Sequence, residues 1–180
     1  MSETKSDQTF VEADPYPWPY NGDLTPSNTC LIVIDMQVDF CSKGGYVDKM
    51  GYDISLTRKP IEPIQKVFEC LRGKKYPHIM HTREGHRPDL ADCPPNKLWR
   101  SAQIGAEIGS MGPCGRILVK GEDGWQIIPE LAPMPGEIVI DKPGKGSFIG
   151  TNLDLILRSR GITNIVSTLL LGMTRREHFE

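Results

Sequence analysis

The sequence lacks the features that mark several common classes of protein. It has no run of like charges and no basic stripe with interleaved aromatic residues, and its formal net charge is -2, so we expect no nucleic-acid partner. No apolar run is long enough to span a membrane, so we expect no membrane association either. No Gly-x-Gly-x-x-Gly motif follows the first apolar strand, which argues against a nucleotide-binding protein. Small molecules are the ligands that composition favours.

Cysteine is sparse and is not arranged in pairs. The five cysteines stand at positions 30, 41, 70, 93 and 114, and no Cys-x-x-Cys motif occurs. Their odd number and the lack of a secretory signal indicate reduced thiols, and therefore a cytoplasmic protein.

The composition predicts one folded domain preceded by an arm. A chain of 180 residues with 38% apolar and 24% charged residues can bury one sizeable core. Residues 1–28 begin polar and then carry four prolines among aromatic residues, which is typical of a disordered tip followed by an extended arm. The arm could dock on another surface or pack on its own domain, which we place at residues 29–180.

The segment CLIVIDMQVDFC, residues 30–41, organises the rest of the chain. Its continuous apolar run over residues 31–34 predicts a strand covered on both faces, as in a parallel sheet between helices, and the run ends at Asp35. Open parallel sheets carry their chemistry at the carboxyl ends of the strands. Asp35 is therefore either a site residue or a simple cap of the turn that follows the strand.

The remaining elements alternate between strands and helices. Apolar periodicity and end signals predict helices over residues 57–73, 99–108 and 151–160. Strands are predicted over residues 78–81, 137–140 and 162–171. This order predicts an α/β fold with a three-layer, Rossmann-like, doubly wound parallel sheet, in which Asp35 and Lys142 meet at one edge.

Two short motifs allow other interpretations. In HTREGH, residues 81–86, the side chains of His81, Glu84 and His86 could bind a metal, but a loop lacks the spacing that fixes ligands on one face. We therefore expect no metal. DKPGKG, residues 141–146, could cradle a phosphate, although it lacks the spacing of a P-loop.

The segments IDMQVDF, GPCGRILV, GWQIIPEL and DKPGKGSF, taken in this order, resemble the isochorismatase-like cysteine hydrolases. Within that family they resemble the biuret and ureidoacrylate amidohydrolases more than the nicotinamidases. The resemblance runs from residue 31 to residue 166 and implies an Asp-Lys-Cys triad whose first two members are Asp35 and Lys142. It places Gln37 and Phe40 near the substrate pocket. It also implies a homo-oligomeric enzyme without a cofactor, which cleaves a C–N bond of a small amide or ureido substrate.

The end of the chain departs from the family pattern. After GITNIV the relatives continue with a Gly-Val-Thr-Thr-Asp-Val-Cys type of segment, whereas this sequence reads STLLLGMTRREHFE. The nucleophile position falls on Arg175 or on His178, depending on the alignment, and neither is a thiol. We therefore expect a domain without its C-terminal strands and without its nucleophile. The alternative to an active hydrolase is an inactive, truncated form that serves as a partner subunit or has no function.

Overall fold

The computed structural model describes residues 9–168, and its centre is a four-stranded parallel sheet in the order β5-β2-β1-β6. The strands are β1 (Thr29–Ile34), β2 (Ile79–Glu84), β5 (Ile138–Lys142) and β6 (Asn164–Thr168), with a separate pair β3 (Met111–Gly112) and β4 (Gly115–Arg116). The helices are α1 (Val38–Cys41), α2 (Tyr46–Lys49), α3 (Ile54–Arg58), α4 (Ile61–Gly73), α5 (Pro95–Gln103) and α6 (Leu153–Ser159). Two short 3₁₀ helices cover Asp123–Trp125 and Pro129–Leu131.

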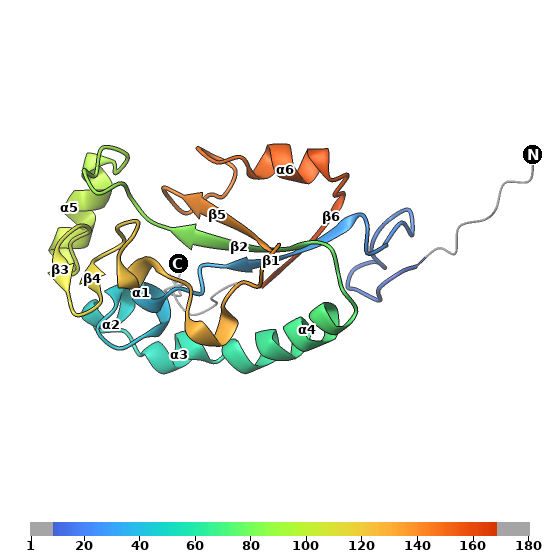
Figure 1. The fold of residues 1–180 in the computed structure, drawn as a ribbon, viewed down its shortest axis with the longest axis horizontal. Coiled ribbons are helices and arrows are strands. Elements are labelled where there is room, and N and C mark those ends of the chain that lie inside the picture. The colour runs from blue at the N-terminus through green and yellow to red at the C-terminus, as the bar shows by residue number, and fades with distance from the viewer. Residues whose placement is uncertain (1–8, 169–180) are drawn as a thin grey trace, which may run out of the picture.

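The helices form a layer on each side of the sheet, which confirms the predicted α/β class. Figure 1 shows α3 and α4 below the sheet and α6 above it. The arrowheads of β1, β2 and β5 point toward the side where α1, α2 and α5 gather. The carboxyl ends of the strands therefore share one edge, as right-handed crossovers in a parallel sheet require.

Both faces of β1 are buried, as its continuous apolar run predicted. Leu31 and Val33 join the core beneath the sheet, together with the buried face of α4, whereas Cys30 and Ile32 join the core that α6 covers. Successive side chains of a strand point to opposite faces, so an unbroken apolar run is what a doubly covered strand needs. This burial places Asp35 directly at the end of a strand that is enclosed on both faces.

The single helix predicted over residues 57–73 is wrong, because the structure has two helices there. Asp53 caps α3 by accepting the backbone N–H of Ser55 at 2.8 Å, and α3 ends at Arg58. Pro60 then precedes α4. A proline has no N–H for a helical hydrogen bond and its ring clashes with the preceding turn, so the helical pattern is interrupted.

The strands predicted over residues 78–81 and 137–140 are too short. β2 continues through Glu84 and β5 through Lys142, so HTREGH begins inside a strand and not in a loop. The reason is pairing: Arg83 and Glu84 of β2 pair with Asp141 and Lys142 of β5. The hydrogen bonds between β2 and β5 thus keep these polar residues in the strand up to the edge of the sheet, although no apolar pattern in the sequence predicts a strand there.

Three other boundaries also differ from the prediction. The helix expected over residues 99–108 is α5 and begins at Pro95, with proline in its first turn. The helix expected over residues 151–160 is the shorter α6, before which the Thr151 hydroxyl accepts the N–H of Leu153 at 3.2 Å. The last strand begins at Asn164, and its predicted part over residues 169–171 lies outside the described residues.

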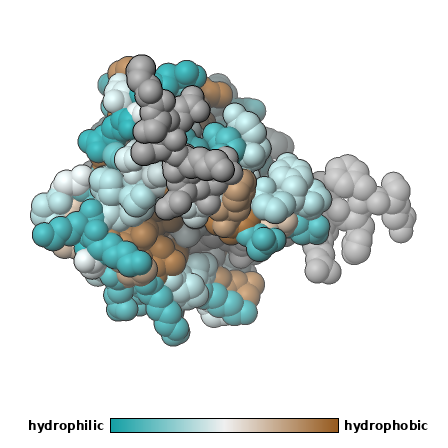
Figure 2. All heavy atoms as spheres, turned by 90° about the vertical axis from the view of Figure 1, so that its right-hand side faces the viewer, coloured by the Kyte–Doolittle hydropathy of each residue, from teal (hydrophilic) through white to brown (hydrophobic). Residues whose placement is uncertain are grey.

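The described part of the arm folds back on itself and joins the domain near β6. Val11 and Trp18 form an antiparallel bridge, and the backbone N–H groups of Thr163 and Asn164 both donate to the carbonyl of Asn28. Figure 2 shows the side of the molecule from which the arm extends, where separate apolar patches lie among hydrophilic residues. None of the helices within residues 9–168 combines the length and the apolar character that a membrane span needs.

Candidate active site

Asp35 lies where β1 ends and adopts the left-handed conformation, with φ of 53°. Non-glycine residues adopt this conformation at an energetic cost, and such positions are common at functional sites. Its Oδ1 accepts a hydrogen bond of 2.6 Å from the hydroxyl of Thr82, on the neighbouring strand. The carboxylate is thus held in a fixed position at the sheet edge.

Lys142 lies beside Asp35, as the sequence predicted. Its side chain is 0% exposed, and its Nζ is 2.7 Å from Asp35 Oδ2 and 3.5 Å from Glu84 Oε2. The same ammonium donates to the carbonyl of Gly144 at 2.9 Å. The DKPGKG loop therefore presents a carbonyl oxygen to a cation, whereas a phosphate cradle requires N–H groups that point at the ligand.

The two carboxylates at this edge differ in their protonation behaviour. Burial raises the pKa of Asp35, and the neighbouring Lys142 and Thr82 only partly offset the effect. Burial also acts to raise the pKa of Glu84, but Lys97 and Lys142 outweigh it and lower that pKa below its ordinary value. Paired groups whose pKa values are pushed apart suit different roles. Asp35 is therefore the group better suited to accept a proton, and Glu84 the group better suited to stay ionised.

The side chains of HTREGH do not converge on one point. His81 contacts Glu137 at 2.8 Å, Glu84 contacts the lysines, and the Nδ1 of His86 lies 3.2 Å from Asp92. His81 and Glu84 are three residues apart on a strand, so their side chains project to opposite faces. Within residues 9–168, no group of three or more acidic, histidine or cysteine side chains is placed to hold a metal.

Gln37 and Phe40, predicted near the pocket, are both buried. The amide nitrogen of Gln37 donates to the carbonyls of Glu84 and Trp125, both at 2.9 Å, and its oxygen accepts the N–H of Glu84 at 2.7 Å. Phe40 packs in the core beneath the sheet, edge-on to Tyr46. Gln37 thus fixes the backbone of the residue that contacts Lys142, and a direct role of either side chain in substrate binding stays a prediction.

Two thiols of the described residues, those of Cys41 and Cys114, contact backbone carbonyls away from the Asp35–Lys142 pair. Cys41 contacts the carbonyl of Thr57, and Cys114 contacts that of Lys43. Burial raises the pKa of Cys30 and of Cys41 to about 12, so both remain protonated at neutral pH. Since the thiolate is the nucleophile, a buried thiol with such a pKa is unsuited to attack a carbonyl. The candidate nucleophile positions Arg175 and His178 lie outside the described residues.

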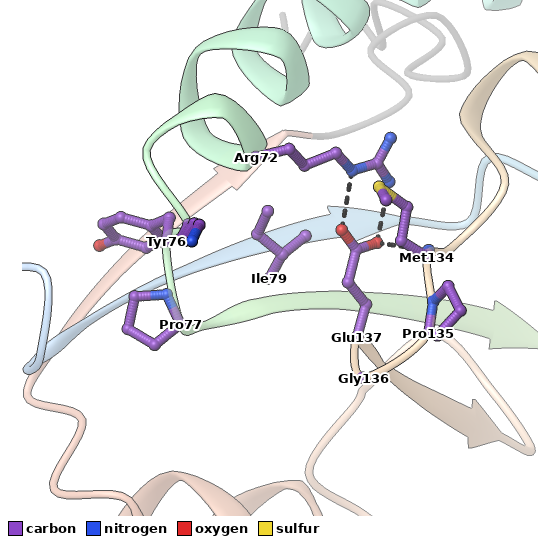
Figure 3. Close-up of a pocket in the computed structure, with 9 residues that line it drawn as sticks. Arg72, Tyr76, Pro77, Ile79, Met134, Pro135, Gly136 and Glu137 are labelled. Carbon is purple, nitrogen blue, oxygen red and sulfur yellow. Dashed lines mark hydrogen bonds and ion pairs between the residues drawn. The ribbon is translucent and has the colours of Figure 1, made fainter.

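A pocket of about 280 Å³ lies at the opposite end of the sheet, where β2 and β5 begin. Figure 3 shows Arg72 and Glu137 pointing toward each other at one side of it, with Tyr76 and Pro77 at the other. Arg72 forms two hydrogen bonds to Glu137, of 2.8 and 2.9 Å. This ion pair ties the end of α4 to the start of β5, and the pocket includes neither Asp35 nor Lys142.

Three contributors to the site have no clear signal in the sequence. Thr82 orients Asp35, Glu84 shares Lys142, and Lys97 of α5 binds Glu84 at 2.6 Å. In the sequence, Glu84 stands out only as a possible metal ligand. A longer β2 that ends at Glu84 would have predicted Thr82 and Glu84 at the carboxyl edge of the sheet. No sequence pattern in the segment between β2 and β5 marks Lys97.

His86 should make the stability of the fold depend on pH. Because the Lys97 ammonium can only donate, its 2.8 Å contact with His86 Nε2 requires that nitrogen to be unprotonated. Burial and then Lys97 lower the pKa of His86 below its ordinary value of 6.5. The unfolded chain therefore binds more protons below about pH 6.5, and the free energy of unfolding decreases as the pH falls.

We expect His86→Gln to reduce this pH dependence by up to about 1.4 kcal/mol per pH unit. Glutamine keeps a hydrogen-bond acceptor for Lys97 but does not titrate. The measurement is urea unfolding at pH values from 5 to 7.5. Equal slopes for the wild type and His86→Gln would contradict the assignment.

The parallel sheet and its helical layers define an α/β protein with the isochorismatase-like fold, and the Asp35–Lys142 pair lies buried at the carboxyl edge of the sheet. The chain belongs to the isochorismatase family, because the isochorismatase domain model matches residues 29–169.

The particular relatives are amidohydrolases. The chain is 33% identical over 146 residues to the ureidoacrylate amidohydrolase RutB of Agrobacterium fabrum, an alignment that covers 79% of this chain and 64% of the relative. It is also 33% identical over 148 residues to RutB of Pseudomonas syringae pv. syringae, covering 81% of this chain and 60% of that one. The chain thus spans less than two thirds of the length of these curated relatives.

Solved structures share the fold. A cysteine hydrolase from Pseudomonas syringae pv. phaseolicola superposes with a TM-score of 0.63 at 26% identity, over 81% of this chain and 62% of the other. An N-carbamoylsarcosine amidase from Thermoplasma acidophilum gives a TM-score of 0.52 at 28% identity, over 78% and 66% of the two chains. These matches confirm the predicted Rossmann-like architecture.

Proposed function

We propose that this chain derives from cysteine hydrolases that cleave a C–N bond of a small amide or ureido compound, as the RutB relatives do by name. The observation that carries the proposal is the Asp35–Lys142 pair, 2.7 Å apart and buried at the carboxyl edge of the sheet. A buried carboxylate with a raised pKa, held by a lysine, is suited to take a proton from a thiol.

The reaction would proceed by acyl transfer. Asp35 accepts the proton of a cysteine thiol, the sulfur attacks the carbonyl carbon, and the C–N bond breaks to release ammonia or an amine that takes up the proton. Water then attacks the thioester, forms the acid and returns the thiol. Lys142 keeps Asp35 oriented and balances its charge before the proton transfer.

A second candidate is a non-catalytic form that associates with complete subunits or has no function. It is favoured by the contacts of Cys41 and Cys114 with backbone carbonyls and by the burial that raises the pKa of Cys30 and Cys41. The two candidates share the same charged pair but differ in whether a thiol reaches it.

The purified 180-residue chain should release no ammonia from ureidoacrylate, biuret or nicotinamide. A chimera that follows Val166 with the corresponding C-terminal segment of a RutB relative should release ammonia from at least one of them. The measurement is a coupled ammonia assay, with the RutB relative as a positive control. Turnover by the unaltered chain would overturn the assignment of the missing thiol, and a folded but inactive chimera would favour the non-catalytic candidate.

A further inference from the structure

The charged groups at the sheet edge continue beyond Lys142. Glu84 Oε1 lies 2.6 Å from the Nζ of Lys97, which in turn lies 2.8 Å from His86 Nε2. Asp35, Lys142, Glu84 and Lys97 thus form a charged row in which carboxylates and lysines alternate. The side chains of Glu84 and Lys97 are 10% and 16% exposed, so the row is shielded from water along its length.

Lys142 is shared unequally between its two carboxylates. Its ammonium lies 2.7 Å from Asp35 but 3.5 Å from Glu84, although both carboxylates are largely buried and both attract a cation. The difference arises because the other oxygen of Glu84 is already bound to Lys97 at 2.6 Å. A carboxylate that has one close cation gains less from drawing in a second.

Lys97 is itself held from several directions. It projects from the first turns of α5, donates to His86, and lies 3.4 Å from the carbonyl of Pro143 in the loop after β5. The Nδ1 of His86 is fixed in turn by Asp92 at 3.2 Å. Lys97 therefore links the segment between β2 and β5, which contains α5, to the ends of both strands. It cannot leave Glu84 without breaking these contacts.

We propose that Lys97 is a positioning residue of the site, which occupies Glu84 and thereby keeps Lys142 against Asp35. The inference rests on the proposed function, in which Asp35 is the general base. Without Lys97, Glu84 competes for Lys142, the ammonium moves away from Asp35, and Asp35 becomes a carboxylate that is buried without a close cation. Such a group holds its proton more strongly.

The test follows the titration of individual carboxylates by carbon-13 NMR in the folded chain. In Lys97→Met the midpoint of the Asp35 titration should rise by about 1 pH unit or more, the usual effect of losing an opposite charge at close range. Lys97→Arg should restore the wild-type midpoint because it keeps the cation. Lys66→Met serves as the matched control, because Lys66 pairs only with Glu62 on the exposed face of α4 and should leave Asp35 unchanged.

A double-mutant cycle separates positioning from the direct effect of the lost charge. In a Glu84→Gln background nothing competes for Lys142, so adding Lys97→Met should leave the Asp35 midpoint unchanged. A rise that persists in this background, or a Lys97→Met variant in which only Glu84 shifts, would overturn the proposal. Lys97→Gln carries the same expectation as Lys97→Met if the latter does not fold.

The readout requires no turnover. An inactive chimera would refute the proposed function and leave the titration result standing, whereas an unchanged Asp35 would refute the role of Lys97 whatever the activity.

Discussion

Lys142→Met is expected to lower the free energy of unfolding by about 3–5 kcal/mol at neutral pH. Methionine fills a similar volume, so the loss comes from charge and not from a cavity. Lys142 is fully buried between Asp35 and Glu84, and its removal leaves the largely buried Asp35 without its cation. Breaking a buried pair by removing one partner is costly for this reason.

The loss should shrink on acidification. In the variant the pKa of Asp35 lies even further above its ordinary value, so the folded variant takes up a proton that the unfolded chain binds only at lower pH, and acid stabilises it relative to neutral pH. Adding Asp35→Asn should recover part of the stability, because the unpaired charge disappears. The exposed Lys66→Met should change stability by less than about 0.5 kcal/mol. Urea unfolding at pH 5 and pH 7.5 measures all three, and a pH-independent loss would contradict the explanation.

Asp35→Asn in the active chimera should lower kcat by about three orders of magnitude or more. The reason is that replacing any one residue of a catalytic triad removes most of the rate acceleration that the triad provides. Asparagine keeps the shape and can still pair with Thr82, but it cannot accept a proton from the thiol. The substrate contacts remain, so KM should change far less than kcat. Steady-state kinetics of ammonia release provide both values.

A matched carboxylate far from the site provides the control. Asp154→Asn on α6 removes only an exposed pair with Arg158 and should leave kcat unchanged. A chimera that tolerates Asp35→Asn as well as it tolerates Asp154→Asn would show that Asp35 only caps the turn after β1 and is not the base.

Local sequence patterns determined the fold class and one half of the site. The unbroken apolar run ending in Asp35 identifies a doubly covered strand, and a second apolar run ending near Lys142 identifies another strand of the sheet. Because parallel strands present their carboxyl ends at one edge, the meeting of Asp35 with Lys142 follows from the pattern alone. The run of apolar residues that predicts burial is a local property of the sequence. It can therefore be recognised without the tertiary structure.

Only the tertiary structure decided where β2 ends and what surrounds Lys142. Arg83 and Glu84 lie in a strand because β5 offers them ladder partners more than fifty residues away, and no local preference carries that information. Lys97 contacts Glu84 although the two residues are thirteen positions apart and joined by irregular chain. Neither spacing nor periodicity in the sequence therefore predicts the contact. The sequence thus determined which two charges meet, whereas long-range pairing and side-chain packing decided how Lys142 is shared between its carboxylates.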